Sequence, residues 1–100
     1  EKEKLLWKDT EPSVLITHLG VVKEMLDAVP LWNKEILKEI IFPYAEAQGK
    51  GAVLWPLRVA LSGRDKSADP FTLLAILGKD EACIRIDEAI TSLSTIEAHT

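Results

Sequence analysis

Few residues of the types that carry out covalent chemistry occur in this 100-residue sequence, and their spacing assembles no catalytic group. The two histidines are His18 and His99, and the single cysteine is Cys83. His18 lies at helical spacing from Val14 and Met25, which predicts a partly buried position at the edge of the core. One cysteine forms no internal disulfide and no metal-ligand cluster, and Cys83 is predicted to lie in the core. We therefore expect no catalytic residue and no metal site.

Basic residues are the more informative group, because they gather in one part of an acidic chain. The formal net charge is −4, yet the window from Lys50 to Lys79 holds five basic and two acidic side chains, a net +3. Phosphate binding needs local Lys and Arg rather than a positive total charge. Three of those charges lie in residues 64–68, a stretch without a large apolar side chain that is expected to be an exposed loop. The pattern predicts one basic surface on an acidic domain.

The elements that must position these residues are predicted to be helices. The chain is 47% hydrophobic with only six aromatic residues, and apolar side chains recur at helical spacing throughout. This favours an all-α fold, a compact bundle of about five helices in a single domain over residues 1–100. The expected helices cover residues 12–29, a segment that starts after an Asn33 cap, and residues 52–62, 70–77 and 79–93.

Local signals set the expected boundaries of these helices. Asp69 followed by proline is the strongest helix-start signal in the chain and is expected to begin the helix over residues 70–77. Gly63 is expected to end the helix over residues 52–62. Pro43 is expected to kink the second helix or split it after Ile41. Residues 49–51, Gly-Lys-Gly, are expected to interrupt the chain, and Leu54 is expected to point inward. Residues 94–100 are expected to form a frayed tail.

Compartment and membrane association follow from what the sequence lacks. The longest charge-free run, residues 12–22, is too short and polar to cross a bilayer, and the N-terminus has no signal-peptide pattern. With no disulfide pair either, we expect a cytoplasmic protein without membrane contact. The first residue is not methionine, which suggests a fragment of a longer chain.

A continuous stretch of sequence carries a specific resemblance. Residues 51–71 read Gly-Ala-Val-Leu-Trp-Pro-Leu-Arg-Val-Ala-Leu-Ser-Gly-Arg-Asp-Lys-Ser-Ala-Asp-Pro-Phe, and residues 77–81 read Leu-Gly-Lys-Asp-Glu. This resembles the C-terminal anticodon-binding domain of bacterial glutamyl-tRNA synthetases, in which a Trp-Pro-Leu-Arg helix precedes a Pro-Phe helix and a Leu-Gly-Lys-Glu sequence. Residues 6–9 and Trp32 fit the same pattern, so the resemblance covers nearly the whole chain.

The resemblance implies that this domain binds the anticodon loop of tRNA and catalyses nothing alone. A class I catalytic domain of the same parent protein, not contained in this chain, would attach glutamate to tRNA using ATP and Mg²⁺. The domain itself would need no cofactor. Its partners would be tRNA and that catalytic domain, and we expect a monomer.

The resemblance also implies which residues contact RNA. Arg58 would meet an anticodon base or its phosphate, and Arg64 and Lys66 would attract phosphates. Phe71 is either an RNA contact or a core anchor, and Trp55 is expected to pack rather than stack on a base. Two residues differ from the family pattern. Ala68 stands where relatives often have proline, and Ile84 stands where relatives often have a basic residue. The complete set implied is Arg58, Arg64, Lys66, Ser67, Ala68, Pro70 and Phe71.

Two other functions fit the sequence less well. The acidic total and few aromatics suit a helical protein-interaction module that does not contact RNA. An independent enzyme is the third alternative. Lys66 and Ser67 superficially resemble the lysine-serine signature loop of class I synthetases, but no Rossmann strand pattern surrounds them.

Overall fold

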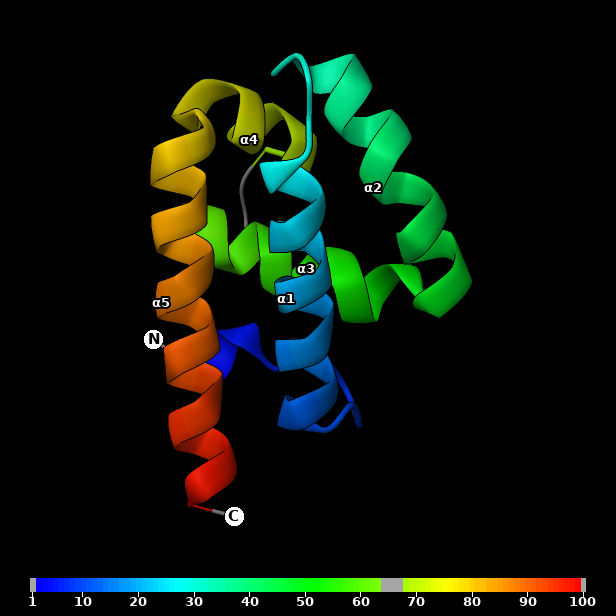
Figure 1. The fold of residues 1–100 in the computed structure, drawn as a ribbon. Coiled ribbons are helices and arrows are strands. Elements are labelled where there is room, and N and C mark those ends of the chain that lie inside the picture. Colours follow the sequence, from blue (N-terminus) through cyan, green and yellow to red (C-terminus); the bar gives the residue numbers. More distant parts are fainter. Residues whose placement is uncertain (1, 64–67, 100) are drawn as a thin grey trace.

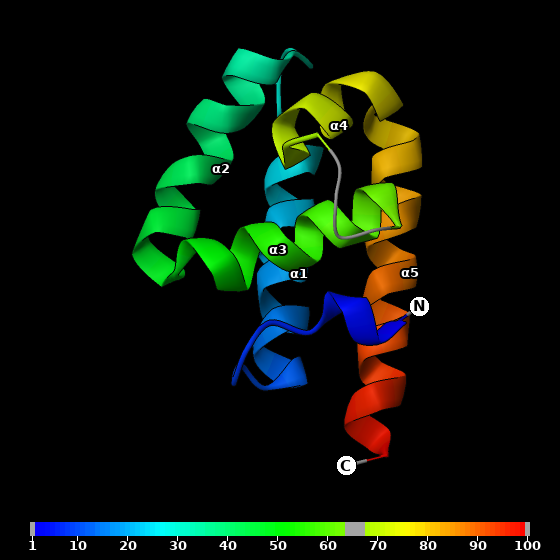
Figure 2. The same cartoon turned by 180° about the vertical axis from the view of Figure 1, so that it is seen from behind.

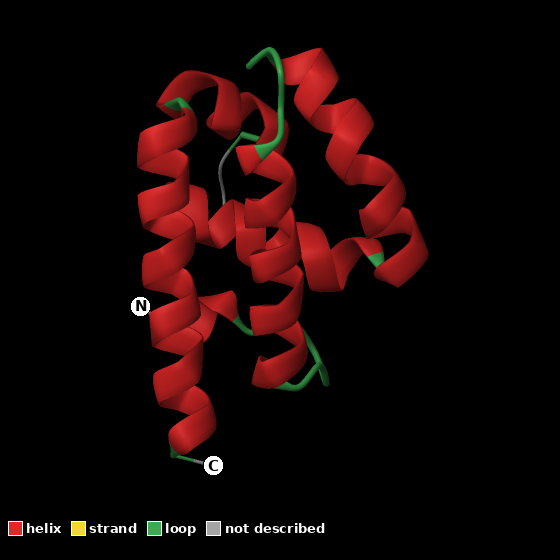
Figure 3. Cartoon of the chain, viewed as in Figure 1, coloured by secondary structure: helices red, strands yellow, loops and turns green. Residues whose placement is uncertain are grey.

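The computed structural model describes residues 2–63 and 68–99, and these form helices joined by short connections, with no strand among them (Figures 1 and 3). Predicted residues Arg64, Lys66 and Ser67 lie outside the described residues. In chain order the elements are the 3-10 helix η1 (Lys2–Leu5), α1 (Pro12–Asp27), α2 (Lys34–Gln48), α3 (Lys50–Ser62), α4 (Pro70–Leu77) and α5 (Lys79–Ala98). The all-α prediction is confirmed.

Helices α1 and α5 run antiparallel side by side and form one face of the molecule (Figure 1). Their pairing buries Leu19 and Val22 of α1 and Ile86 of α5 completely. At the surface Lys23 bridges to Asp87, with 2.7 Å between Nζ and Oδ1. Burial of the apolar stripes contributes most of the stabilisation, since an exposed ion pair adds little.

Helix α3 crosses behind this pair and is the central element of the fold (Figure 2). It contacts α1, α2, α4, α5 and η1. Its buried side chains include Val53, Leu57 and Leu61, none of them accessible to solvent. Leu54 was predicted to point inward with Leu57 and Leu61, but it is only half-buried. Its side of the helix faces the groove described below, which is why it stays partly accessible.

Helix α2 lies to one side and is a single helix, so of the kink or split expected at Pro43, the split after Ile41 does not occur. Its N-cap is Asn33, as predicted, whose Oδ1 accepts a hydrogen bond from the Ile36 amide at 2.9 Å. Pro43 lies inside the helix on its exposed side. A proline there removes one backbone hydrogen bond, and the buried Leu37, Ile41 and Ala45 on the opposite side hold the helix together.

Two further boundaries differ from the sequence prediction. The Gly-Lys-Gly stretch interrupts the chain only at Gly49, and α3 already begins at Lys50. Helix α5 continues to Ala98, beyond the predicted end at residue 93 and through part of the expected frayed tail. Hydroxyl groups of Ser94 and Thr95 donate to carbonyls four residues earlier, and Ile96 packs against the core. Packing of Ile96 stabilises turns that propensity alone leaves weak, because hydroxyl bonds to the preceding turn add no helix stability of their own.

The start of α4 forms as its sequence predicts. Asp69 is the N-cap, and its Oδ1 accepts from the Thr72 amide at 3.0 Å while Pro70 occupies the first turn. Gly63 ends α3 in the left-handed conformation, with φ of 78°. These two caps place the start of α4 beside the middle of α3, where the groove lies.

Candidate nucleic-acid interface

A groove of about 280 Å³ opens where the N-terminal segment, α3 and the start of α4 meet. Eight residues line it, two of them tryptophans and three of them charged: Trp7, Lys50, Gly51, Leu54, Trp55, Arg58, Asp69 and Pro70. The wall therefore comes from three stretches of chain that only the tertiary fold brings together. It combines flat apolar surface with hydrogen-bonding groups of both signs, as sites for planar polar ligands do.

The aromatic wall consists of Trp7 and Trp55. Their ring centroids are 5.6 Å apart with an interplanar angle of 39°. The Trp55 indole Nε1 donates to the Lys4 carbonyl at 2.8 Å, which fixes the N-terminal segment against α3. Both indoles are half-buried, so part of each remains accessible. The Trp7 ring lies directly over Gly51, where a Cβ atom would overlap the indole.

Arg58 and Asp69 supply the polar part of the groove. Arg58 is half-buried on α3, and its guanidinium can donate two parallel hydrogen bonds to a base edge or a phosphate. Partial burial raises the pKa of the Asp69 carboxyl, but hydrogen bonds from Thr72 and the charge of Lys34 outweigh this and hold that pKa below its usual value. Asp69 is thus an anionic acceptor at neutral pH.

The structure brings part of the predicted site together. Arg58 and Pro70 line the groove, and Ala68 is exposed just before the Asp69 cap. Phe71 is buried with only 4% of its surface exposed, and its ring packs edge-on against Phe42 at 6.4 Å between centroids. Of the two roles predicted for Phe71, the structure supports the core anchor.

Sequence reasoning missed several residues of the groove. None of these was named as a site residue: Trp7 was matched to the family pattern and Asp69 to a helix cap, Lys50 was counted in the basic window, and Gly51 was placed in an interruption of the chain. A signal for Gly51 was present, because glycine inside a helix costs stability and often marks a close approach. The sequence does not reveal which residue makes that approach, since Trp7 lies far away along the chain.

The remaining chemically capable residues lie away from the groove. His18 is buried, and its Nδ1 is 2.8 Å from the Tyr44 hydroxyl oxygen, which joins α1 to α2. Burial raises the pKa of the Cys83 thiol, which is half-buried, so the protonated form is favoured. Across residues 2–63 and 68–99, no group of three or more His, Cys, Asp or Glu side chains is placed to hold a metal ion.

No helix in the described part of the chain has both the length and the apolar character needed to cross a membrane.

Comparison with known proteins gives one family and a consistent set of relatives. Residues 2–90 match the model of a family described as "Anticodon binding domain". A glutamate–tRNA ligase of Myxococcus xanthus is 40% identical over 75 residues, which cover 73% of this chain and 16% of that protein. The glutamate–tRNA ligase of Stenotrophomonas maltophilia is 39% identical, covering 77% of this chain and 17% of the relative. The glutamate–tRNA ligase of Herpetosiphon aurantiacus is 34% identical over 93 residues, which cover 91% of this chain and 19% of that protein. The chain therefore spans less than a fifth of the length of these relatives.

Proposed function

The chain belongs to the anticodon-binding domain family, and from that premise we propose that it binds the anticodon loop of a tRNA for a glutamate–tRNA ligase. The observation that carries the proposal is the groove, which places two half-buried indoles beside the Arg58 guanidinium and the Asp69 carboxylate. The groove joins two aromatic side chains to charged groups of both signs, whereas the depression beside α2 that includes Lys38 and Phe42 has one aromatic side chain.

The chemistry of the groove fits an unpaired nucleobase. RNA sequence is read mainly where bases are splayed out of a helix, stacked on aromatic rings and hydrogen-bonded along their edges. Trp7, which has the Lys8 ammonium over its ring, and Trp55, expected from the sequence only to pack, supply the aromatic surface of the groove. Stacking of one base contributes about 1–3 kcal/mol. Arg58 donates to acceptor atoms of a base, and Asp69 can accept from an exocyclic amino group.

In this proposal the chain binds tRNA, and another domain of the parent protein attaches glutamate to it. Activation of glutamate with ATP and Mg²⁺ would take place in a catalytic domain that this chain does not contain. This chain would act without a cofactor, as a monomer in the cytoplasm, and would hold the tRNA. We propose that its binding energy helps to select the tRNA that receives glutamate.

A binding experiment tests this proposal. Fluorescence anisotropy compares an anticodon stem-loop of a glutamate tRNA with a hairpin of the same stem and a permuted loop sequence. We expect the anticodon loop to bind more tightly. Arg58→Ala should weaken that binding by about tenfold or more, because one bidentate pair contributes about 1–3 kcal/mol of discrimination.

Two further variants separate the role of Arg58 from charge and stability. Arg58→Lys keeps the charge but loses the planar fork, so it should retain part of the affinity and lose the preference for the anticodon loop. Lys23→Gln removes one charge on the α1–α5 face and should leave binding unchanged. Equal affinity for both hairpins would contradict base reading, and binding to neither would contradict the proposed function.

A further inference from the structure

Three lysines lie on or near the groove, Lys50 in its lining and two on α2. Lys34 and Lys38 are four residues apart and therefore project from the same side of that helix. Lys34 Nζ lies 3.7 Å from Asp69 Oδ2, at the edge of the groove, and Lys50 lines the groove itself. We call these three exposed residues the lysine ridge. It extends from the groove along the face that α2 turns toward α3 and α4.

Phe42 holds two of these ammonium groups in place. Lys38 Nζ is 5.6 Å and Lys50 Nζ is 5.3 Å from the centre of the Phe42 ring. The ring is half-buried and packs edge to face against Phe71. The aromatic ring is uncharged, so it does not cancel the field of the ammonium group, as the carboxylate of an ion pair does. Within residues 2–63 and 68–99, neither Lys38 nor Lys50 forms an ion pair with a carboxylate.

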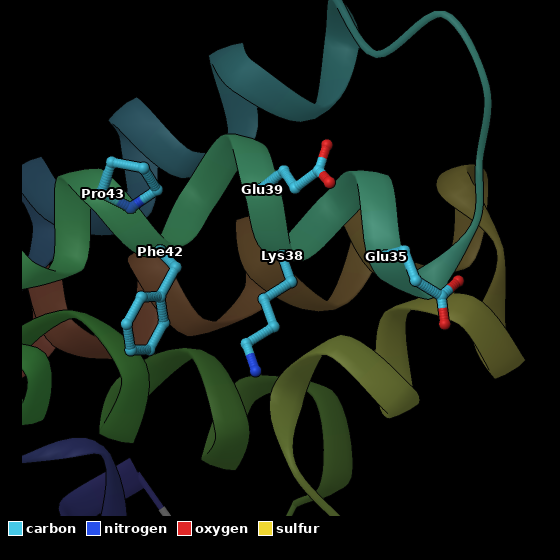
Figure 4. A pocket seen from close by; sticks show the side chains of 5 residues that line it. All are labelled: Glu35, Lys38, Glu39, Phe42 and Pro43. Carbon is cyan, nitrogen blue, oxygen red and sulfur yellow. The ribbon is translucent and has the colours of Figure 1, made fainter.

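An open depression of about 460 Å³ gives access to this arrangement. It is lined by Glu35, Lys38, Glu39, Phe42 and Pro43 (Figure 4). The Lys38 and Phe42 side chains extend together toward α3, whereas the two carboxylates point away from the Lys38 ammonium (Figure 4). An anion is therefore attracted at the Phe42 end of the depression, next to Lys50, and repelled at the Glu35 end.

We propose that the lysine ridge binds backbone phosphates of the RNA strand next to the nucleotide held in the groove. The inference rests on the proposed function and extends it from one groove to a path for the strand. Lys50 belongs to both surfaces, so the strand continues from the base site onto Lys38 without crossing a gap. Phosphate contacts of this kind set the register and orientation of a nucleic acid, while base contacts supply specificity.

The dependence of affinity on salt tests this path. Each phosphate of a single strand that the protein neutralises contributes about 0.7 to the magnitude of the slope of log K against log salt concentration. The double variant Lys38→Gln/Lys50→Gln should therefore lower the magnitude of that slope by about 1.4 for the anticodon stem-loop. The preference for the anticodon loop over the permuted loop should remain, because Arg58 is intact.

Matched controls exclude a loss of fold or of total charge. Lys23→Gln/Lys79→Gln removes two charges at α1 and α5, and the salt dependence of its affinity should have the same slope as that of the unsubstituted chain. Lys38→Arg/Lys50→Arg retains both charges and should keep the full slope. Thermal unfolding of every variant checks that each is folded at the temperature of the binding experiment.

A chemical change in the RNA provides a second measurement. A neutral methylphosphonate placed at each loop phosphate in turn should weaken binding to the parent chain at one or two positions. At those positions the Lys38→Gln/Lys50→Gln variant should lose nothing further. If the parent chain binds and the double variant keeps its slope, the ridge is overturned while the proposed function stands. If the parent chain does not bind, both are overturned.

Discussion

At the scale of single residues, Gly51 is the position on which the aromatic wall depends. Alanine normally stabilises a helix relative to glycine, by about 0.5–1 kcal/mol. At position 51 the added methyl group would overlap the Trp7 indole, which must then leave its place beside Trp55. The cost of the displaced ring opposes the gain in helix propensity.

We predict that Gly51→Ala lowers the free energy of unfolding by about 1–3 kcal/mol, the usual cost of overpacking. Urea unfolding measures this change, and near-ultraviolet circular dichroism should report the altered Trp7–Trp55 pair. Gly20→Ala is the matched control, because no atom lies within 4 Å of a Cβ atom built at Gly20 in α1. It should stabilise the chain by about 0.5–1 kcal/mol. Equal effects of the two substitutions would contradict the close approach of Trp7.

At the scale of elements, a pair of side chains joins α1 to α2, of which His18 is buried and Tyr44 is half-buried. His18 and Tyr44 are hydrogen-bonded and their rings meet edge to face, with centroids 5.6 Å apart. Burial lowers the pKa of His18 below its usual value, so the folded chain favours the neutral ring. As the pH falls through the pKa that His18 has in the unfolded chain, the unfolded state binds more protons than the folded state. The free energy of unfolding therefore decreases as the pH falls.

We predict that the melting temperature is steady near neutral pH and decreases as the pH falls below about 6.5, the unperturbed pKa of histidine. Calorimetry between pH 7.5 and pH 5 measures this dependence. His18→Phe keeps an aromatic ring without a titrating group and should reduce the decrease. His99→Gln serves as control, because His99 is exposed near the C-terminal end of α5. A decrease unaffected by His18→Phe would refute the assignment to this residue.

The element boundaries also indicate how far the sequence determines the fold. Where a cap is a local interaction, as at Asn33, Asp69 and Gly63, the sequence predicts the boundary correctly. It fails after residue 93, where α5 continues because Ile96 packs against the core, and at Pro43 the split expected as one alternative does not occur. Periodicity places Leu57 and Leu61 correctly in the core.

Prediction of the candidate site has the same limit. Arg58 and Pro70 follow from a continuous stretch of sequence, and both line the groove. Trp7 reaches the groove only because the N-terminal segment packs on α3, a tertiary contact that no local pattern encodes. Phe71 is in the core rather than on the surface for a related reason, since its position depends on Phe42 of a different helix.

At the scale of the whole molecule, α3 links all parts of the fold. The described chain has a radius of gyration of 12.4 Å, close to the ~13 Å expected for a folded chain of this length. Because α3 touches every other helix, a defect in its centre should be felt throughout the molecule rather than in one region. Leu57, fully buried near its middle, is the suitable position for a test.

We predict that Leu57→Ala lowers the free energy of unfolding by about 2–5 kcal/mol, from lost apolar burial and the cavity that remains. Unfolding followed by far-ultraviolet circular dichroism and by tryptophan fluorescence should give one coincident transition. The exposed Leu31 is the control, and Leu31→Ala should change stability by less than about 0.5 kcal/mol. Two separate transitions for Leu57→Ala would show that α3 does not couple the elements.

The hydrogen bond from Trp55 to the Lys4 carbonyl holds the first residues against α3, so the aromatic wall of the groove depends on the position of those residues. Trp7 faces the groove only while the first residues are seated on α3, so occupancy of the groove and seating of these residues are thermodynamically linked. A nucleotide that touches Trp7 therefore holds the beginning of the chain in place. Conversely, any event that lifts the beginning of the chain would weaken the proposed RNA binding without altering a single basic residue.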